Sequence, residues 1–168
     1  FDYEEKVCCR MRWFPGRSPG RPQVTECDAL ADESLYRPSA LGAAGVEPAE
    51  VRAGDDTPFD LWFRTGPAGI DRGAAVVFYT PGQRPLGTGP QTSDAGKPGY
   101  VEVTVSPATG VRVEAQGLGF RVADGELNEG DEVRLTVGRE GGFRWTPLAG
   151  RKELKVIVHV GEGEPTQR

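Results

Sequence analysis

Short runs in which apolar and polar residues alternate constrain this chain more than any other feature of its sequence. Val101, Val103 and Val105 alternate with Glu102 and Thr104. The same period of two recurs in the segments 59–64, 111–115, 133–137 and 154–160. A period of two is typical of β-strands that bury one face and expose the other. The sequence therefore predicts a protein built from short strands.

Glycine and proline separate these runs. The chain of 168 residues holds 24 Gly and 14 Pro, which favours many short elements joined by turns over long helices. Parallel strands would need helical crossovers of about a dozen residues or more, and no segment has that pattern. We therefore expect an all-β fold, an antiparallel two-sheet sandwich of the immunoglobulin or fibronectin kind with an irregular amino-terminal arm.

Individual strands can be assigned within this scheme. Val46 to Val51 contains a proline and predicts an edge strand, whereas Phe59 to Phe63 predicts a core strand. The apolar run 73–82 predicts a central strand buried on both faces. The runs 101–105 and 111–115 are separated by a short turn and predict a hairpin.

The chain divides into three predicted parts. Residues 1–42 are expected to form an irregular, cysteine-containing arm, residues 43–160 the sandwich, and residues 161–168 a flexible tail. Within the arm, 7–13 alternates like a strand, and 28–36 has the composition of one short helical turn.

All three cysteines, Cys8, Cys9 and Cys27, lie in this arm. Neighbouring cysteines rarely bond to each other, so the expected disulfide joins Cys27 to either Cys8 or Cys9. Closing a loop of about 20 residues would contribute roughly 3 kcal/mol. A bridge implies an oxidising compartment, and the alternative is three reduced thiols in the cytosol. No cysteine follows Cys27, which excludes the inter-sheet disulfide of antibody domains.

Charge and hydropathy exclude some partners. The net charge is −5, with 25 acidic and 20 basic residues, so nucleic acid is not an expected partner. No stretch reaches the roughly 20 apolar residues of a membrane span. The first residue is Phe1, which fits either removal of a targeting peptide or a chain trimmed at its amino terminus. The expected disulfide leads us to expect an extracytoplasmic or cell-surface location.

Three segments carry a resemblance to a known family. They read VEPAEVRAGDDTPFDLWFRTGPAGIDRGAAVVFY, PQTSDAGKPGYVEVTVS and LNEGDEVRLTVG, and fall between about residues 43 and 160. Together they resemble the amino-terminal β-sandwich region of bacterial proteins of unknown function whose later portion looks like a PHP-type metallohydrolase. The resemblance implies that chemistry belongs to His and Asp ligands in that later portion, so it assigns no catalytic residue here. It does not extend to the cysteine-containing arm.

The residues themselves offer little chemistry. His159 is the only histidine, and one histidine cannot build a multi-histidine metal centre. The acidic residues Asp124, Glu126, Glu129 and Asp131 fall in one turn, but their spacing is not that of an EF-hand, and a solvated turn is expected. We therefore predict no catalytic residue, no metal site and no cofactor.

Tryptophans are the candidate contact residues. Trp62 is expected to face outward from its strand, and Trp145 to lie in a glycine-flanked loop. Exposed indoles stack on sugars or anchor protein interfaces. In the alternative, the arm covers this face and buries Trp13 against Trp62.

The sequence thus predicts a non-catalytic module for structural assembly or protein interaction. Its expected partner is another protein, either further copies of itself, giving an oligomer, or a downstream domain. Two alternatives are an accessory domain at the front of a metal-dependent hydrolase and a carbohydrate-binding module.

Overall fold

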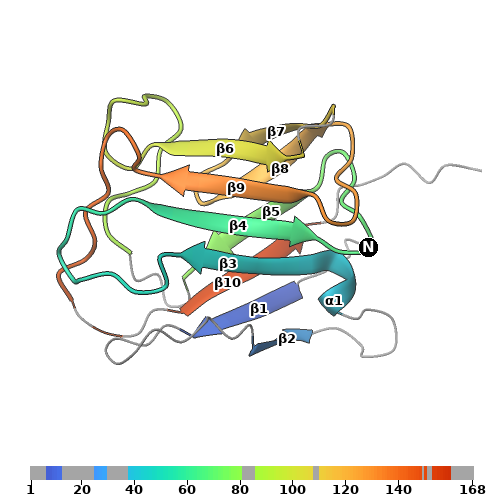
Figure 1. Ribbon diagram of the computed structural model, residues 1–168, viewed down its shortest axis with the longest axis horizontal. Helices are drawn as coiled ribbons and strands as arrows, with labels where there is room; N and C mark the ends of the chain where they lie inside the picture. The colour runs from blue at the N-terminus through green and yellow to red at the C-terminus, as the bar shows by residue number, and fades with distance from the viewer. Residues whose placement is uncertain are drawn as a thin grey trace, which may run out of the picture.

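Two antiparallel sheets packed face to face make up the fold (Figure 1). The structure is a computed structural model that describes residues 7–12, 25–29, 38–80, 86–107, 110–148, 150 and 153–159. The described residues contain ten strands and one four-residue helix. The prediction of an all-β, two-sheet antiparallel sandwich is confirmed.

The first sheet has four strands in the order β3-β4-β9-β6. The strands are β3 (Gly42–Glu47), β4 (Phe59–Thr65), β9 (Glu132–Val137) and β6 (Val101–Ser106). Its centre is the long-range pair β4–β9, in which Leu61 lies opposite Leu135. β3 is an edge strand, but it ends at Glu47, before Pro48, so the edge strand expected at 46–51 overlaps it only at Val46 and Glu47.

The second sheet has six strands in the order β2-β1-β10-β5-β8-β7. The strands are β2 (Thr25–Ala29), β1 (Val7–Arg12), β10 (Glu153–His159), β5 (Ala75–Tyr79), β8 (Gly119–Asp124) and β7 (Arg112–Ala115). The helix α1 (Pro38–Leu41) leads directly into β3.

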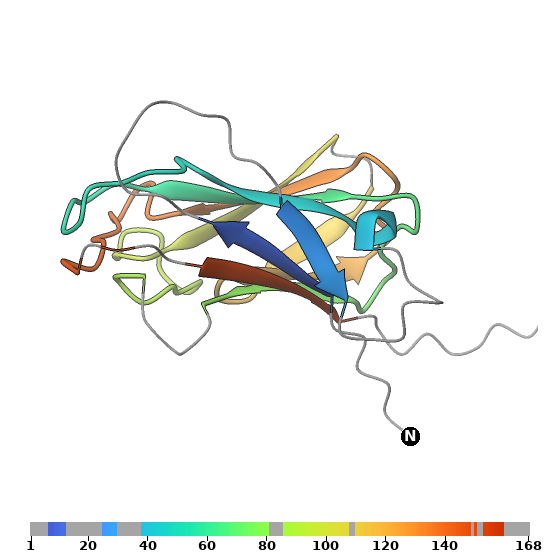
Figure 2. The same ribbon diagram turned by 90° about the horizontal axis from the view of Figure 1, so that it is seen from below.

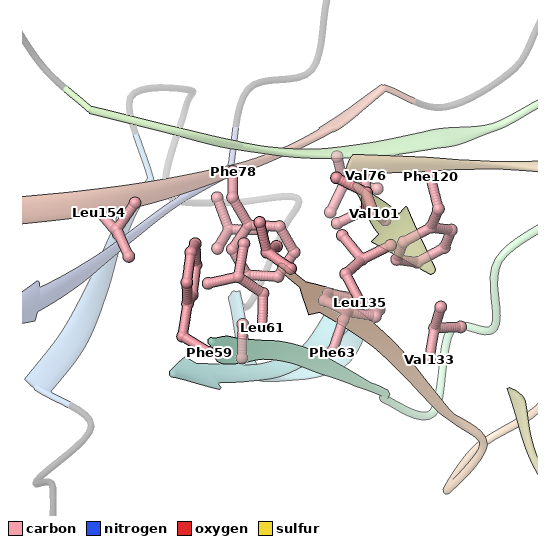
Figure 3. Packing of buried hydrophobic residues seen from close by; sticks show 14 of the residues in the cluster. Phe59, Leu61, Phe63, Val76, Phe78, Val101, Phe120, Val133, Leu135 and Leu154 are labelled. Atoms are coloured by element: carbon pink, nitrogen blue, oxygen red, sulfur yellow. The ribbon is translucent and has the colours of Figure 1, made fainter. Parts of the chain in front are cut away.

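Side chains on the inward faces of the two sheets form the core between them. Leu61, Val76, Val122 and Leu135 have no exposed surface, and each has less buried neighbours on both sides along its strand. Figure 3 shows inward side chains from both sheets meeting in this layer. Fully burying one such side chain is worth about 1.5–3 kcal/mol, so the packed layer holds the two sheets together.

The expected hairpin between 101–105 and 111–115 is wrong. β6 pairs with β9 in the four-stranded sheet, whereas β7 pairs with β8 in the six-stranded sheet. The connection therefore passes from one sheet to the other. Two short alternating runs close in sequence fit a hairpin and a crossing equally well, because both arrangements bury one face of each run.

The strand from the run 73–82 is central, but it is not buried on both faces. In β5, Val76 and Phe78 are buried, while Ala75, Val77 and Tyr79 are half-buried. The outward side chains are half-buried and not fully exposed, which is compatible with a continuously apolar run. A sandwich strand has only one inward face.

The amino-terminal arm contains more regular structure than its sequence predicts. Residues 7–12 form β1, close to the expected strand, but residues 25–29 also form a strand, β2, whose sequence TECDA lacks apolar alternation. The helical turn lies at 38–41, after the expected position. β2 is stabilised by pairing with β1, a tertiary effect that propensity does not report. The predicted tail, 161–168, lies outside the described residues.

Three aromatic rings close one end of the core. Phe59 lies 4.9 Å from Phe143 and 4.9 Å from Trp145, and Phe143 lies 5.1 Å from Trp145, measured between ring centroids. The indole N–H of Trp145 donates a 2.8 Å hydrogen bond to the carbonyl of Thr57. Trp145 is only 6% exposed, so its polar atom is satisfied inside the protein.

Replacing Trp145 tests this arrangement. Trp145→Phe should lower the free energy of unfolding by about 1–3 kcal/mol, because it leaves the Thr57 carbonyl without its indole donor. Trp145→Ala should cost more, about 3–5 kcal/mol. Urea denaturation measures both. Leu148→Ala is the control, since Leu148 is 72% exposed and should change stability by less than about 0.5 kcal/mol. Equal effects of all three changes would contradict a buried Trp145.

Candidate functional site

Among the residues that the structure describes, the most connected polar side chains lie on the outward side of the four-stranded sheet. We call this side the outer face. In β4, Asp60, Trp62 and Arg64 alternate with buried Phe59, Leu61 and Phe63. In β9, Glu132 and Arg134 alternate in the same way with buried Val133 and Leu135. The β4–β9 register sets Trp62 opposite Arg134 and Arg64 opposite Glu132, so the outward residues form adjoining rows.

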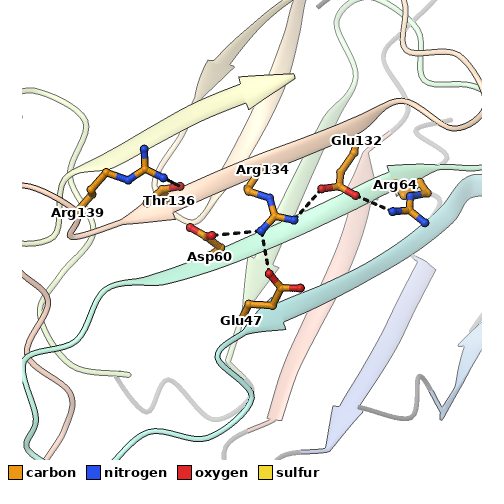
Figure 4. Close-up of polar contacts among 7 residues, drawn as sticks. All are labelled: Glu47, Asp60, Arg64, Glu132, Arg134, Thr136 and Arg139. Carbon is orange, nitrogen blue, oxygen red and sulfur yellow. Dashed lines mark hydrogen bonds and ion pairs between the residues drawn. The ribbon is translucent and has the colours of Figure 1, made fainter. Parts of the chain in front are cut away.

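Arg134 is the centre of this face (Figure 4). One guanidinium nitrogen donates to Glu47 at 2.9 Å and to Asp60 at 3.2 Å, and the other donates to Glu132 at 2.9 Å. These partners come from β3, β4 and β9. A planar guanidinium suits such a fan of carboxylates because its donors point in fixed directions. Arg134 therefore ties three neighbouring strands together.

Two more arginines extend the pairing. Arg64 donates to Glu132 at 2.9 Å, so this carboxylate bridges Arg64 and Arg134. Towards β6, Arg139 contacts Glu102 at 3.4 Å and Thr136 at 3.3 Å. The side chains of Arg139 and Arg64 are each 60% exposed, so these outer pairs contribute less than the Arg134 contacts do.

The network stabilises the charged forms of Glu132 and Arg134. Burial by itself raises the pKa of Glu132, but hydrogen bonds from Arg134 and Arg64 outweigh it and leave the pKa below its ordinary value. The pKa of Arg134 is raised, first by its hydrogen bond to Glu47 and then by that to Glu132. Glu132 is thus a fixed anion at neutral pH, suited to accepting hydrogen bonds and unsuited to donating a proton.

Trp62 lies beside this network and is half-buried. Gly45 is its Cα partner on β3, and a Cβ built on Gly45 would lie 2.2 Å from an indole carbon. The ring therefore sits directly on the Gly45 backbone. The guanidinium carbon of Arg64 lies 5.9 Å from the ring centroid, within cation–π range. The structure thus gives Trp62 two intramolecular contacts, one with Gly45 and one with Arg64.

The other expected contact residues lie elsewhere. Trp145 is buried in the aromatic cluster, so the expectation of an exposed indole there is wrong: the loop folds inward because its apolar side chains complete the core. Trp13 lies outside the described residues. The described strands of the arm, β1 and β2, extend the six-stranded sheet and do not lie in the sheet that carries Trp62.

The cysteines are placed by the strand register. Cys8 and Cys9 lie in β1 and Cys27 in β2, with Cys9 opposite Cys27 and Cys8 opposite Asp28. The structure describes the backbone of these strands and not the side chains of the cysteines. The expected bridge therefore stays a prediction.

His159 and the acidic turn are not brought together. His159 is half-buried on β10 and pairs with Ala75. In the turn between β8 and β9, Asp131 is 6% exposed, and its carboxylate accepts the backbone N–H of Asn128 at 2.8 Å. The backbone N–H of Asp131 in turn donates to the carbonyl of Asn128 at 3.0 Å, so the two bonds close the turn. Among the described residues, no three metal-ligating side chains are grouped closely enough to hold an ion.

Sequence reasoning missed the Arg134 network. The signal was present as charges alternating with Val133 and Leu135, but alternation identifies only the exposed face. Which charges meet depends on register, and the partners Glu47 and Asp60 lie far from Arg134 in sequence.

Comparison with protein-family models, with curated proteins and with solved structures found no match for this chain. Among the described residues, no helix has the length and hydrophobicity that crossing a bilayer requires.

The charge on Glu132 gives a pH-dependent contribution to stability. Glu132→Gln should lower the free energy of unfolding by about 1 kcal/mol at pH 7. The folded-state pKa lies below the unfolded one, so the contribution is complete above the unfolded value of about 4.3. It disappears as pH falls through the folded value, because the unfolded chain takes up the proton first. Urea denaturation from pH 7 to pH 3 measures the difference between the two proteins.

The matched control repeats Glu132→Gln in a chain that also carries Arg64→Met and Arg134→Met. There the cost of the Gln change should be small at every pH, since both donors are gone. A cost in the wild-type background that stays constant down to pH 3 would contradict the assignment.

Gly45 and Trp62 should behave as a coupled pair. Gly45→Ala puts a methyl group into the indole, so Trp62 must move, and we expect a loss of about 1–3 kcal/mol and a change in tryptophan fluorescence. In a protein that already carries Trp62→Ala, Gly45→Ala should lower the free energy of unfolding much less. A double-mutant cycle measures this difference. Additive losses would show that the ring does not lie on Gly45.

Proposed function

We propose that this chain is a non-catalytic sandwich module that assembles with further copies of itself by exchanging its amino-terminal strands. The observation that carries the proposal is the place of β1. This strand comes from the arm, yet it extends the second sheet at β10, a strand from the far end of the described sequence (Figure 2). An element that adds strands to an edge within one chain can add them to the same edge of another copy.

The amino-terminal strands meet the rest of the six-stranded sheet along β10. The β1 register covers two positions of β10, Met11↔Leu154 and Arg12↔Glu153. On its other side β10 pairs with β5 at five positions, from Lys155 to His159. Among the described strands β2 pairs only with β1, so the strand pair β1–β2 is joined to the six-stranded sheet at β10 alone, and exchange would have to open that one junction.

Charges oppose new pairing at two of the other sheet edges. The edge strand β7 carries exposed Arg112 and Glu114, and the edge strand β6 carries exposed Glu102. Charged edge strands oppose new edge-to-edge pairing. Exchange at β10 would instead reuse the pairing that already exists, so no new complementary surface is required.

Assembly is better supported than sugar binding. A sugar-binding indole needs an open ring face, and Trp62 has Gly45 on one side and Arg64 within cation–π range. For the accessory-domain alternative, the partner would be a downstream domain, and the coding sequence after Arg168 would decide that case.

Proline in β1 tests the assembly. Met11→Pro and Arg12→Pro each remove a backbone N–H, and hydrogen-bonded and non-hydrogen-bonded pairs alternate along a ladder, so one of them removes a donor at the β10 junction. We expect the full-length chain to form dimers or larger species as concentration rises, and the more harmful proline to shift it to monomer. Sedimentation equilibrium over a concentration series measures this.

Met11→Leu and Arg12→Lys are the matched controls, because they keep the backbone donors and should assemble like the unaltered chain. Circular dichroism of each variant establishes that the sandwich is still folded. The proposal is rejected if the unaltered chain stays monomeric at every concentration, or if both folded proline variants assemble as it does.

A further inference from the structure

The register of the two arm strands sets a pair of cysteines directly opposite each other. Val7 pairs with Ala29, Cys8 with Asp28 and Cys9 with Cys27, and the register shifts only after Cys9. Cys9 and Cys27 therefore hold the same position across the ladder. Cys8 is displaced by one position, on the other face of the strand pair.

Opposed positions suit a disulfide. Directly opposite residues of an antiparallel pair have Cα atoms about 4.5 or 5.5 Å apart, inside the range of about 4.4–6.8 Å that disulfides occupy. A bond from Cys27 to Cys8 would have to cross from one face to the other, and a bond between adjacent Cys8 and Cys9 would strain the intervening peptide. We propose that Cys9 and Cys27 form a disulfide within one chain and that Cys8 stays a thiol.

The chemistry is thiol–disulfide exchange with a disulfide oxidant, either a small molecule or a protein. The thiolate of Cys9 or Cys27 attacks one oxidant sulfur and forms a mixed disulfide, releasing the other half as a thiol. The second cysteine then attacks the mixed disulfide, forming the S–S bond of the protein and releasing the second half. Two protein thiols are oxidised, and one oxidant disulfide is reduced to two thiols.

The bond would give the arm a redox-dependent state. It would join β1 to β2 and leave the β1–β10 pairing uncrossed, because Met11 and Arg12 make that junction. An oxidising environment would fix the strand pair as one unit, and a reducing one would let the two strands separate. This inference rests on the β1–β2 register and stands whether or not copies exchange strands.

The test oxidises the reduced full-length chain with oxidised glutathione and maps the product. Trypsin cuts after Lys6 and Arg10 but does not cut before Pro22 or Pro38, so the bond should link fragments 7–10 and 18–52. The intact mass should fall by two hydrogen atoms, and a non-reducing gel should show a monomer. The link should survive in Cys8→Ser and disappear in Cys9→Ser and Cys27→Ser.

Each other product overturns the proposal. A link that survives in Cys9→Ser identifies Cys8 as the partner, and a bond inside fragment 7–10 identifies the adjacent pair. A covalent dimer places the bond between chains, and glutathione on Cys27 without any link shows that no bond closes. Repeating the mapping with Met11→Pro and with Arg12→Pro separates this outcome from a failure of assembly, since one of the two removes a donor at the β10 junction and neither changes a cysteine.

Discussion

Packing of alternate apolar side chains between the two sheets is the interaction on which the other features depend. β4 and β9 lie at the centre of one sheet, and β5 and β10 near the centre of the other, and each sends every second residue into the shared layer. Because the side-chain period is two, a slip of one residue would expose a whole apolar row. Burial therefore fixes the register of the central strands.

The outer face is a consequence of that register. Once Leu61 lies opposite Leu135 in the core, Trp62 must lie opposite Arg134 and Arg64 opposite Glu132 on the other side of the sheet. The Arg134 network then joins β3, β4 and β9 across the surface. Core packing and surface pairing thus specify the same alignment of strands, which is the consistency expected of a unique fold.

Alternation was enough to predict the fold class and most strands of the sandwich, including the runs that form β4, β9 and β10. It failed where the answer depended on a distant partner. The run 111–115 satisfies its pattern in either sheet, and residues 25–29 form a strand only because β1 lies beside them. Trp145 has glycine-rich neighbours, but its ring is buried by Phe59, a residue far away in sequence. The Arg134 contacts were hidden for the same reason.

The place of β10 has a consequence for how the chain reaches its native state. β10 lies between β1 and β5, so the second sheet is interrupted until this late segment is present. During synthesis, β5 would already have left the ribosome with its β10-side backbone groups unpaired. Contacts between residues far apart in the sequence slow folding, and slow folding prolongs the exposure of strand edges. The chain therefore exposes unpaired strand edges until β10, its last described strand, has been synthesised.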